Sequence, residues 1–326
     1  SRAFLPAALE APDMNDTRLR VLDALADGPV AGPALADALD VSRAAVWKHV
    51  EALRDAGFEV SSTDDGYRLD AIPEYGGLAV AHELTAPYGV EYHDSVGSTN
   101  DRARELAAEG ERDVAVVAAE QTGSRGRLDR EWTAPRGGVW TSILVRPDVP
   151  AAQVPVFTLA AAVATANAAR EAGVDAGIKW PNDVLVPDGD GGTRKLAGIL
   201  TEMEGEADRV SWLVVGIGAN VDVPESELPA GATSVAMEGG VADRRAFVQR
   251  VLEGFYELTS GDLDAVLSAW RERALTLGQR VRVETPGGVV EGVARDVEFP
   301  GALLVETDDG VERVTAGDCE HLRAAN

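Results

Sequence analysis

The chain has 326 residues, 45% of them hydrophobic, and a formal net charge of −25. This length accommodates two or three domains with sizeable cores. The single cysteine, Cys319, excludes an intrachain disulfide and a cysteine-based zinc site. No secretory signal pattern opens the sequence, so a cytoplasmic location is expected.

The acidic balance is extreme, because Asp and Glu number 55 whereas Lys and Arg number 30. Only three of the basic residues are lysines: Lys48, Lys179 and Lys195. Such a surface stays soluble in strongly screening salt, which predicts a halophile-like cytoplasm; a coding bias toward Arg, Ala, Gly and Asp is the alternative. In either case a retained lysine is a candidate for a specific role.

Residues 17–70 predict a winged helix that follows a disordered extension at 1–16. Apolar residues recur at helical spacing, and Ser42 is a suitable cap for the recognition helix. The helices are expected over 17–26, 34–39 and 43–56, and the wing strands over 58–60 and 67–69.

The candidate DNA contacts of this segment are Arg43, Lys48 and Arg54, on or near the recognition helix. The whole segment carries six Lys/Arg against ten Asp/Glu. DNA affinity comes largely from phosphate neutralisation, so this balance disfavours general DNA binding. The local charge of the recognition helix nevertheless favours operator binding.

A Pro/Gly-rich linker at 70–77 separates the winged helix from an α/β domain expected over 78–276. The apolar run Val156–Ala169 is too short to span a bilayer and is interpreted as a buried helix, so no membrane association is expected. Strands are expected near 115–119, 139–145, 197–200 and 212–217, and helices near 100–108, 153–172, 244–259 and 262–274.

Residues 277–326 contain short β-branched segments separated by Pro-Gly and Asp-Asp-Gly turns, which predict a small β-barrel.

A basic loop, Gln121-Thr-Gly-Ser-Arg-Gly-Arg-Leu-Asp-Arg130, follows the first of these strands. Arg125, Arg127 and Arg130 bring three guanidinium groups together in an acidic chain, which indicates capture of phosphate or carboxylate. Pairing with the acidic surface is the alternative. The chain contains no G-x-x-x-x-G-K-[ST] motif and this loop does not fit G-x-G-x-x-G, which disfavours a Walker or dinucleotide site.

Two lysines stand in motifs with ligand-binding potential. In Lys179-Trp-Pro-Asn-Asp183, Asn182 could meet a base edge and Asp183 could hold Mg²⁺. Lys195 begins an apolar strand and is expected to face an anion, and Gly198 leaves room beside that strand. Ordinary strand ends with solvated lysines are the alternative for both motifs.

Two further segments are weaker signals. Ser98-Thr-Asn100 begins a predicted helix, where these side chains suit capping as well as ligand binding. Gly216-Ile-Gly-Ala-Asn220 places two glycines in a β segment, which indicates a bulge or a ligand on the backbone; a glycine-bent core strand is the alternative.

The joint order of S-T-N, Q-x-x-x-R-G-R, K-W-P-N-D, R-K-L-A-G-I-L and G-I-G-A-N resembles the central domain of the biotin–protein ligases. With a winged helix before it and a β-barrel after it, the chain resembles the bifunctional ligase/repressor subgroup. The resemblance implies an α+β multidomain fold: a winged helix-turn-helix, a class II synthetase-like mixed α/β domain and an SH3-like β-barrel.

The activity implied by the resemblance uses ATP and Mg²⁺ to form biotinyl-5′-AMP. Biotin then passes to a lysine of a biotin carboxyl carrier protein. A homodimer and biotin-responsive repression at operator DNA are also implied.

The resemblance assigns roles to individual positions. Arg125, Arg127 and Lys195 are the implied catalytic residues and also contact biotin. The other implied biotin contacts are Ser98, Thr99, Asn100, Gln121, Gly126, Gly198 and Gly218, and the implied adenine contacts are Trp132, Asn182 and Asn220. This chain departs from the family loop at Ser124 and Asp129, which replace glycines and could alter loop closure.

Three alternative hypotheses for the function predict different sequence features. A non-catalytic, ligand-sensing winged helix regulator predicts a degraded R-G-R loop or loss of Lys195, and both are present. A lipoate or octanoate transferase is expected to lack this combination of motifs and the terminal barrel. A plain OB-like nucleic-acid module would need an aromatic-studded face, whereas the last fifty residues hold one aromatic, Phe299.

Overall fold

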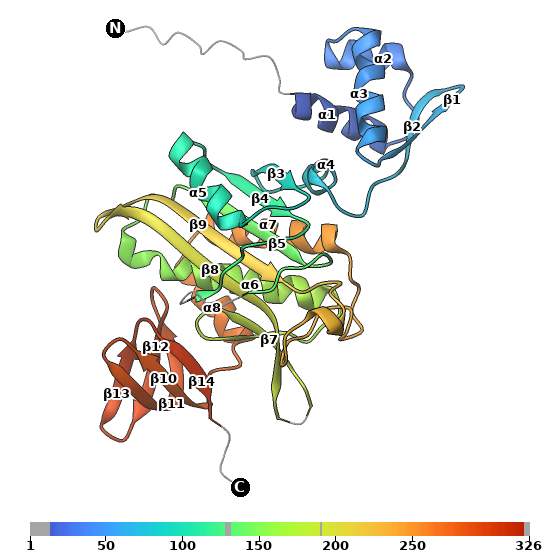
Figure 1. Ribbon diagram of the computed structural model, residues 1–326. Helices are drawn as coiled ribbons and strands as arrows, with labels where there is room; N and C mark the ends of the chain where they lie inside the picture. The colour runs from blue at the N-terminus through green and yellow to red at the C-terminus, as the bar shows by residue number, and fades with distance from the viewer. Residues whose placement is uncertain (1–13, 128–131, 190, 323–326) are drawn as a thin grey trace, which may run out of the picture. The chain divides into compact units, whose positions relative to one another are not determined.

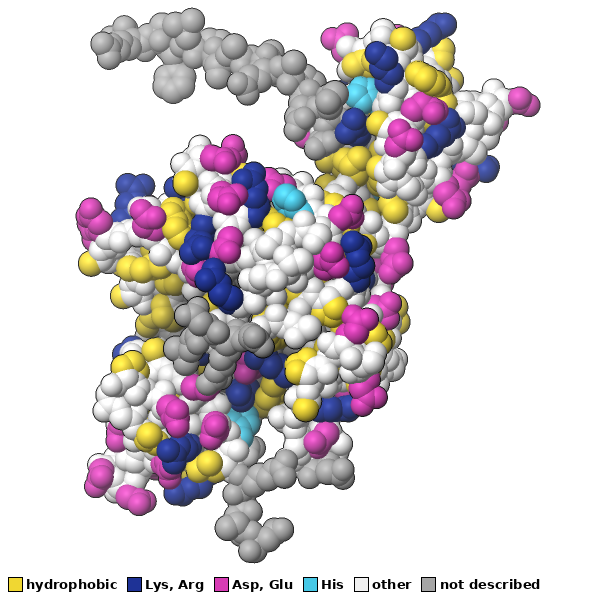
Figure 2. All heavy atoms as spheres, viewed as in Figure 1, with side chains coloured by type: hydrophobic (Ala, Val, Ile, Leu, Met, Phe, Trp, Pro, Cys, Tyr) yellow, Lys and Arg dark blue, Asp and Glu magenta, His cyan; other side chains and the backbone are white. Residues whose placement is uncertain are grey.

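The computed structural model describes residues 14–127, 132–189 and 191–322. These residues form two compact units, the first ending at Glu83 and the second beginning at Leu84 (Figure 1). On the face that Figure 2 shows, acidic side chains are spread out rather than gathered in one patch.

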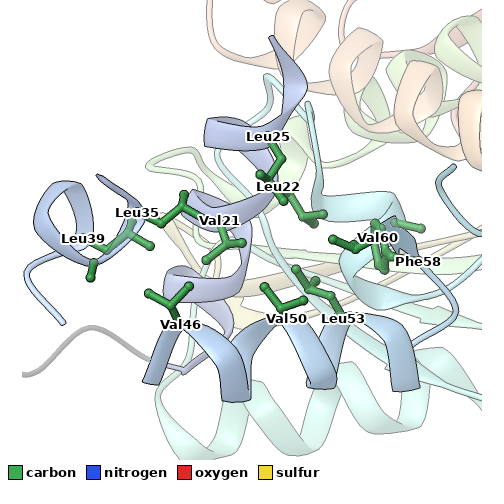
Figure 3. Packing of buried hydrophobic residues seen from close by; sticks show 12 residues of the cluster. Val21, Leu22, Leu25, Leu35, Leu39, Val46, Val50, Leu53, Phe58 and Val60 are labelled. Carbon is green, nitrogen blue, oxygen red and sulfur yellow. The ribbon is translucent and has the colours of Figure 1, made fainter. Parts of the chain in front are cut away.

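The first unit is the predicted helix-turn-helix with a two-stranded wing. Its core combines residues of α1, α2 and α3 with Phe58 and Val60 from the start of the wing (Figure 3). The α3 side chains of Val46, Val50 and Leu53 point into this core, so the opposite face of α3 is left to solvent. The elements are α1 (Met14–Ala26), α2 (Gly32–Leu39), α3 (Arg43–Asp55), β1 (Glu59–Thr63), β2 (Gly66–Ala71) and α4 (Gly77–Ala81).

The boundary between the units differs from the expected one. The central domain was expected to begin at residue 78, but Ala79 of α4 is buried in the core of the first unit. The helix α4 therefore belongs to the winged helix unit, which extends to Glu83. The linker composition at 70–77 marks an irregular connection within this unit and not its end.

The second unit is built on a seven-stranded mixed sheet of order β3-β4-β5-β9-β8-β7-β6. Only the β3–β4 pair is parallel; the other neighbours are antiparallel. The strands are β3 (Gly89–His93), β4 (Val114–Ala118), β5 (Val139–Val145), β6 (Gly177–Lys179), β7 (Asp183–Pro187), β8 (Thr193–Glu206) and β9 (Arg209–Ala219). The sequence did not predict β3, β6 or β7, because these strands are short and carry few alternating apolar positions.

Helix α5 covers part of the sheet by packing Ala103 and Leu106 against Leu144 of β5. Helix α6 packs across β6 to β9, and α7 and α8 pack against α6. The helices are α5 (Thr99–Glu109), α6 (Pro155–Glu171), α7 (Arg244–Thr259) and α8 (Asp264–Arg273). Residues 151–171 are long and apolar enough to cross a membrane by length and composition, but twelve residues of α6 are buried, which confirms the predicted buried helix.

The C-terminal part is a five-stranded antiparallel sheet of order β13-β12-β11-β10-β14. The strands are β10 (Arg280–Thr285), β11 (Gly288–Glu298), β12 (Ala302–Thr307), β13 (Gly310–Val314) and β14 (Asp318–His321). This C-terminal sheet is anchored to the rest of the second unit by buried contacts. The Trp180 indole donates to the Gly301 carbonyl at 2.9 Å, and the Trp180 backbone N–H donates to Thr276 Oγ1 at 2.9 Å.

Candidate active site

A cavity of about 500 Å³ opens over β7, β8 and β9, beside the first turn of α5. It lies on the α5 face of the sheet, because Ser142 and Leu144, two residues apart on β5, contact Thr99 and Ala103 of α5 respectively. The predicted site residues that line it are Ser98, Thr99, Asn100, Gln121, Arg125, Gly126, Arg127, Trp132, Asn182, Asp183, Lys195, Gly198 and Gly218. Chain folding thus brings together motifs from five separate segments.

The first turn of α5 holds a network of buried polar groups. Ser98 caps the helix, since its Oγ accepts from Asp101 N at 3.3 Å, as the sequence predicted. Gln121 Oε1 accepts from the Thr99 backbone N–H at 2.7 Å and from Thr99 Oγ1 at 3.1 Å. The amide Nε2 of Gln121 takes no part in these two bonds, and Gln121 lines the cavity, so this amide can donate to a ligand there.

Asn100 is fixed by partners that the sequence did not reveal. Ser142 Oγ donates to Asn100 Oδ1 at 2.6 Å, and Asn100 Nδ2 donates to Glu202 Oε2 at 2.7 Å. Glu202 in turn accepts from Arg104 Nη1 at 3.3 Å. A Cβ on Gly216 would lie 2.1 Å from Asn100 Oδ1, so this glycine makes room for the asparagine. The alternation of side chains along β5 and β8 was the only signal for Ser142 and Glu202 in the sequence. It does not distinguish a polar residue that faces the cavity from one that faces solvent.

The two described arginines of the basic loop have different partners. Arg125 Nη2 donates to Asp101 Oδ1 at 3.0 Å and its side chain remains half exposed. Arg127 donates from Nη1 to Asn182 Oδ1 at 2.9 Å and from Nη2 to the Gly317 carbonyl at 3.0 Å. Arg127 therefore links the loop to the β6–β7 turn and to the C-terminal sheet.

Ser124, one of the two departures from the family loop, makes a defined contact. Its Oγ donates to the Trp132 carbonyl at 2.6 Å, which ties the two flanks of the loop together. Arg130 and the second departure, Asp129, lie outside the described residues.

Trp132 packs beside the two glycines that were expected to leave room for biotin. A Cβ on Gly198 would lie 3.1 Å from Trp132 Cζ3, and one on Gly218 would lie 2.9 Å from Trp132 Nε1. The ammonium of Lys195 stands 5.0 Å from the centre of the indole ring, in cation–π range. In this structure the glycines therefore accommodate the tryptophan.

Lys195 shares one carboxylate with the lysine of the K-W-P-N-D motif. Lys195 Nζ lies 2.7 Å from Asp183 Oδ1, and Lys179 Nζ lies 3.2 Å from Asp183 Oδ2. Burial alone would raise the pKa of Asp183, but the charges of Lys195 and Lys179 outweigh it, so this pKa is lowered. Asp183 is thus a mostly buried anion between two cations, and each of its oxygens contacts one of them.

This geometry bears on the expected Mg²⁺ role of Asp183. Among the described residues, no group of three or more His, Cys, Asp or Glu side chains could hold a metal ion. The residues present therefore do not fit a resident metal site. The contacts favour Asp183 as the residue that positions Lys195, and its metal role stays a prediction.

We expect Asp183→Asn to lower kcat/KM for the biotin transfer that the resemblance implies by about 10- to 100-fold, because a misplaced Lys195 ammonium weakens transition-state stabilisation. The Mg²⁺ concentration needed for half-maximal rate should stay unchanged. A large increase in that concentration would show metal binding instead. Asp148→Asn, which neutralises a fully exposed carboxylate (96% exposed), is the matched control.

Asn220 does not line the cavity. Its Nδ2 donates to the Thr233 carbonyl at 3.0 Å, and its backbone carbonyl accepts from Val235 N at 3.0 Å. These contacts hold the segment after β9 against residues 233–235. The structure therefore places Asn220 in a supporting position, and its contact with adenine stays a prediction.

The three candidate DNA contacts are not equivalent. Arg43 and Lys48 are exposed on α3. Arg54, in contrast, donates from Nε and Nη2 to the Val60 carbonyl at 2.8 and 2.7 Å and pairs with Glu51 at 2.6 Å. The guanidinium of Arg54 thus fastens α3 to the wing, which favours a structural role over DNA contact.

Comparison with known proteins places these features in a family. Bifunctional ligase/repressor BirA of Bacillus subtilis (strain 168) is 37% identical over 314 residues, which cover 89% of this chain and 93% of the relative. The chain belongs to the biotin protein ligase family. BirA of Escherichia coli (strain K12) is 30% identical over 325 residues, 95% of this chain and 98% of the relative. Biotin–[acetyl-CoA-carboxylase] ligase of Mycobacterium tuberculosis is 36% identical over 249 residues, 70% of this chain and 86% of the relative.

Family models cover each part of this ligase. They are an HTH domain at 17–68, the Biotin/lipoate A/B protein ligase family at 92–220 and the Biotin protein ligase C terminal domain at 276–322. The Aquifex aeolicus biotin protein ligase in complex with biotin and ATP has a TM-score of 0.60 and 26% identity, covering 72% of this chain and 99% of that structure. The predicted fold class and the family resemblance are confirmed, and an ATP-dependent biotin ligase is supported.

Proposed function

We propose that this protein joins biotin to a lysine of a biotin carboxyl carrier protein, with ATP as the energy source. The observation that carries the proposal is the convergence of Arg125, Arg127 and Lys195 on one cavity of a chain whose net charge is −25. These cations can form charge-assisted hydrogen bonds to a polyanionic substrate, in exchange for the acids that pair with Arg125 and Lys195, Asp101 and Asp183.

The first step would join two anions. An oxygen of the biotin carboxylate attacks the α-phosphorus of ATP, and pyrophosphate leaves. Lys195 and Arg127 can offset the repulsion and stabilise the charge that develops on the phosphorus centre. Mg²⁺ is proposed to enter with ATP and to neutralise the pyrophosphate, without a resident metal site.

The second step transfers the acyl group. The neutral amine of the acceptor lysine attacks the acyl carbon of biotinyl-5′-AMP and AMP leaves, so no residue of the ligase becomes a covalent nucleophile. The mixed anhydride is sensitive to water, and the basic loop, whose described residues Arg125, Gly126 and Arg127 line the cavity, is proposed to shield it. The Ser124–Trp132 contact would restrict the opening of that loop.

The proposed site residues divide along the cavity. Ser98, Thr99, Asn100 and Gln121 are proposed to bind the biotin ring system. Gly126, Gly198 and Gly218 would provide backbone room, provided that Trp132 moves aside when biotin enters. Trp132 and Asn182 are then proposed to contact the adenine.

We further propose that the protein represses transcription in response to biotin as a cytoplasmic homodimer in a high-salt cell. The HTH match at 17–68 and the exposed Arg43 and Lys48 support the DNA-binding part. The acidic composition supports the high-salt part.

The direct test is incorporation of labelled biotin into a recombinant carrier domain in multimolar KCl, with and without ATP. Incorporation that requires ATP and the acceptor lysine supports the ligase. Tight biotin binding without any incorporation would instead favour the non-catalytic, ligand-sensing regulator.

A further inference from the structure

The solvent face of α3 carries a large apolar side chain that the fold of its own unit does not bury. Trp47 is 54% exposed, and Ala44, one turn earlier, is also exposed. The core of the unit uses the other side of the helix, through Val46, Val50 and Leu53 (Figure 3). An exposed tryptophan on a helix is a common sign of a contact surface.

Cations flank this apolar pair. Arg43 precedes Ala44 and Lys48 follows Trp47, and all four side chains lie on the solvent face of α3. An apolar centre with cations beside it matches the major groove of duplex DNA, where base edges lie between two phosphate backbones. The HTH match at 17–68 points to the same partner.

The remaining charges of the unit disfavour binding through phosphates alone. Arg54 is bound to the Val60 carbonyl, and Arg68 pairs with Asp70 at 2.6 Å. Residues 17–70 carry ten Asp/Glu against six Lys/Arg. Strong salt weakens phosphate contacts further, whereas apolar contact is not weakened by screening.

We propose that Trp47, with Ala44, recognises thymine in the major groove by apolar contact with its 5-methyl group, while Arg43 and Lys48 contact the flanking phosphates. The inference rests on the proposed repressor function and adds the chemistry of its sequence recognition. Thymine alone among the four bases presents a methyl group in that groove. Specificity in this ligase would then depend on a contact that tolerates salt.

The experiment uses the full-length protein with biotin and ATP to select binding sites from a randomised DNA duplex library at low and at multimolar KCl. The selected duplex is compared with a copy in which deoxyuridine replaces thymidine, which removes only the methyl groups. The wild type should bind the deoxyuridine copy about tenfold more weakly. Trp47→Ala should bind the thymidine duplex about tenfold more weakly than the wild type does. For this variant, replacing thymidine by deoxyuridine should lower the affinity little further, because both changes remove the same contact.

The salt dependence separates the two kinds of contact. Trp47→Ala should leave the slope of log affinity against log salt unchanged, whereas Lys48→Ala should reduce it by about one, as expected for one lost phosphate contact. Trp47→Ala should also transfer biotin to the carrier domain at the wild-type rate. Val311→Ala, an exposed valine of the C-terminal sheet, is the matched apolar control.

Three outcomes would overturn the inference. Additive losses from Trp47→Ala and deoxyuridine would show that the tryptophan does not touch the methyl groups. Unchanged DNA affinity in Trp47→Ala, with a change in sedimentation, would assign Trp47 to contact between protein copies. Failure of the wild type to enrich any duplex would reject the repressor function itself and leave the ligase proposal standing.

Discussion

Substitution Lys195→Ala is expected to lower kcat/KM for biotin transfer by about 100- to 1000-fold, the usual cost of removing a group that stabilises developing charge. Its ammonium lies in the cavity, 2.7 Å from Asp183 and over the Trp132 ring. The variant should be slowed mainly in the formation of biotinyl-5′-AMP, which is measured as ATP–pyrophosphate exchange. Transfer from added biotinyl-5′-AMP should fall less.

Controls for this result come from the other two lysines. Lys48→Ala, in the winged helix unit, should transfer biotin at the wild-type rate. Lys179→Ala removes the second cation from Asp183 and should cost less than Lys195→Ala, because Lys179 does not line the cavity. Equal losses in the Lys179 and Lys195 variants would mean that the charge balance around Asp183, and not a direct contact of Lys195, controls the rate.

Trp180→Ala is expected to destabilise the second unit by about 3–5 kcal/mol, the typical cost of truncating a buried tryptophan. Trp180 is fully buried and its indole joins the β6–β7 turn to the Gly301 carbonyl. Trp180→Phe keeps most of the apolar volume but leaves that carbonyl without its donor, so it should cost about 1–3 kcal/mol. Urea unfolding followed by intrinsic fluorescence and circular dichroism would measure both.

Trp47→Ala is the matched control for Trp180→Ala, because it removes the same side chain from an exposed site. Its free energy of unfolding should change by no more than about 0.5 kcal/mol. The winged helix unit can unfold in a transition of its own. If Trp180→Ala showed one more transition than the wild type, the C-terminal sheet would be an independent folding unit, contrary to the buried contacts that join it to the β6–β7 turn.

The sequence predicted the regular elements well where periodicity was strong. The bounds of β5 (Val139–Val145) and α7 (Arg244–Thr259) match the expected ones, because each has a continuous apolar pattern and clear ends. Strands such as β3 and β14 lacked that pattern and were not predicted. The end of the first unit was misplaced because α4, an apolar five-residue helix after a linker-like stretch, packs backward onto the winged helix core.

The site was predicted only as far as its motifs extended. Residues of S-T-N and K-W-P-N-D converge on the cavity as expected, but Ser142 and Glu202, which fix Asn100, belong to no motif. Their role depends on contacts between residues about 40 and 100 positions apart, which a single sequence does not specify. The same reason explains Arg54, whose partner is a wing carbonyl and not DNA.

The scarcity of lysine limits how far the enzyme can be acylated by its own reactive intermediate. An acyl-adenylate that escapes from a ligase reacts with nearby primary amines, the enzyme's own included. In this chain Lys179 and Lys195 are paired with Asp183, and Lys48 is the one remaining lysine side chain. The guanidinium groups that replace lysine elsewhere stay protonated and are poor nucleophiles. Among the lysine side chains, Lys48 is therefore the one expected to be open to self-modification, on the face of α3 that is proposed to read DNA.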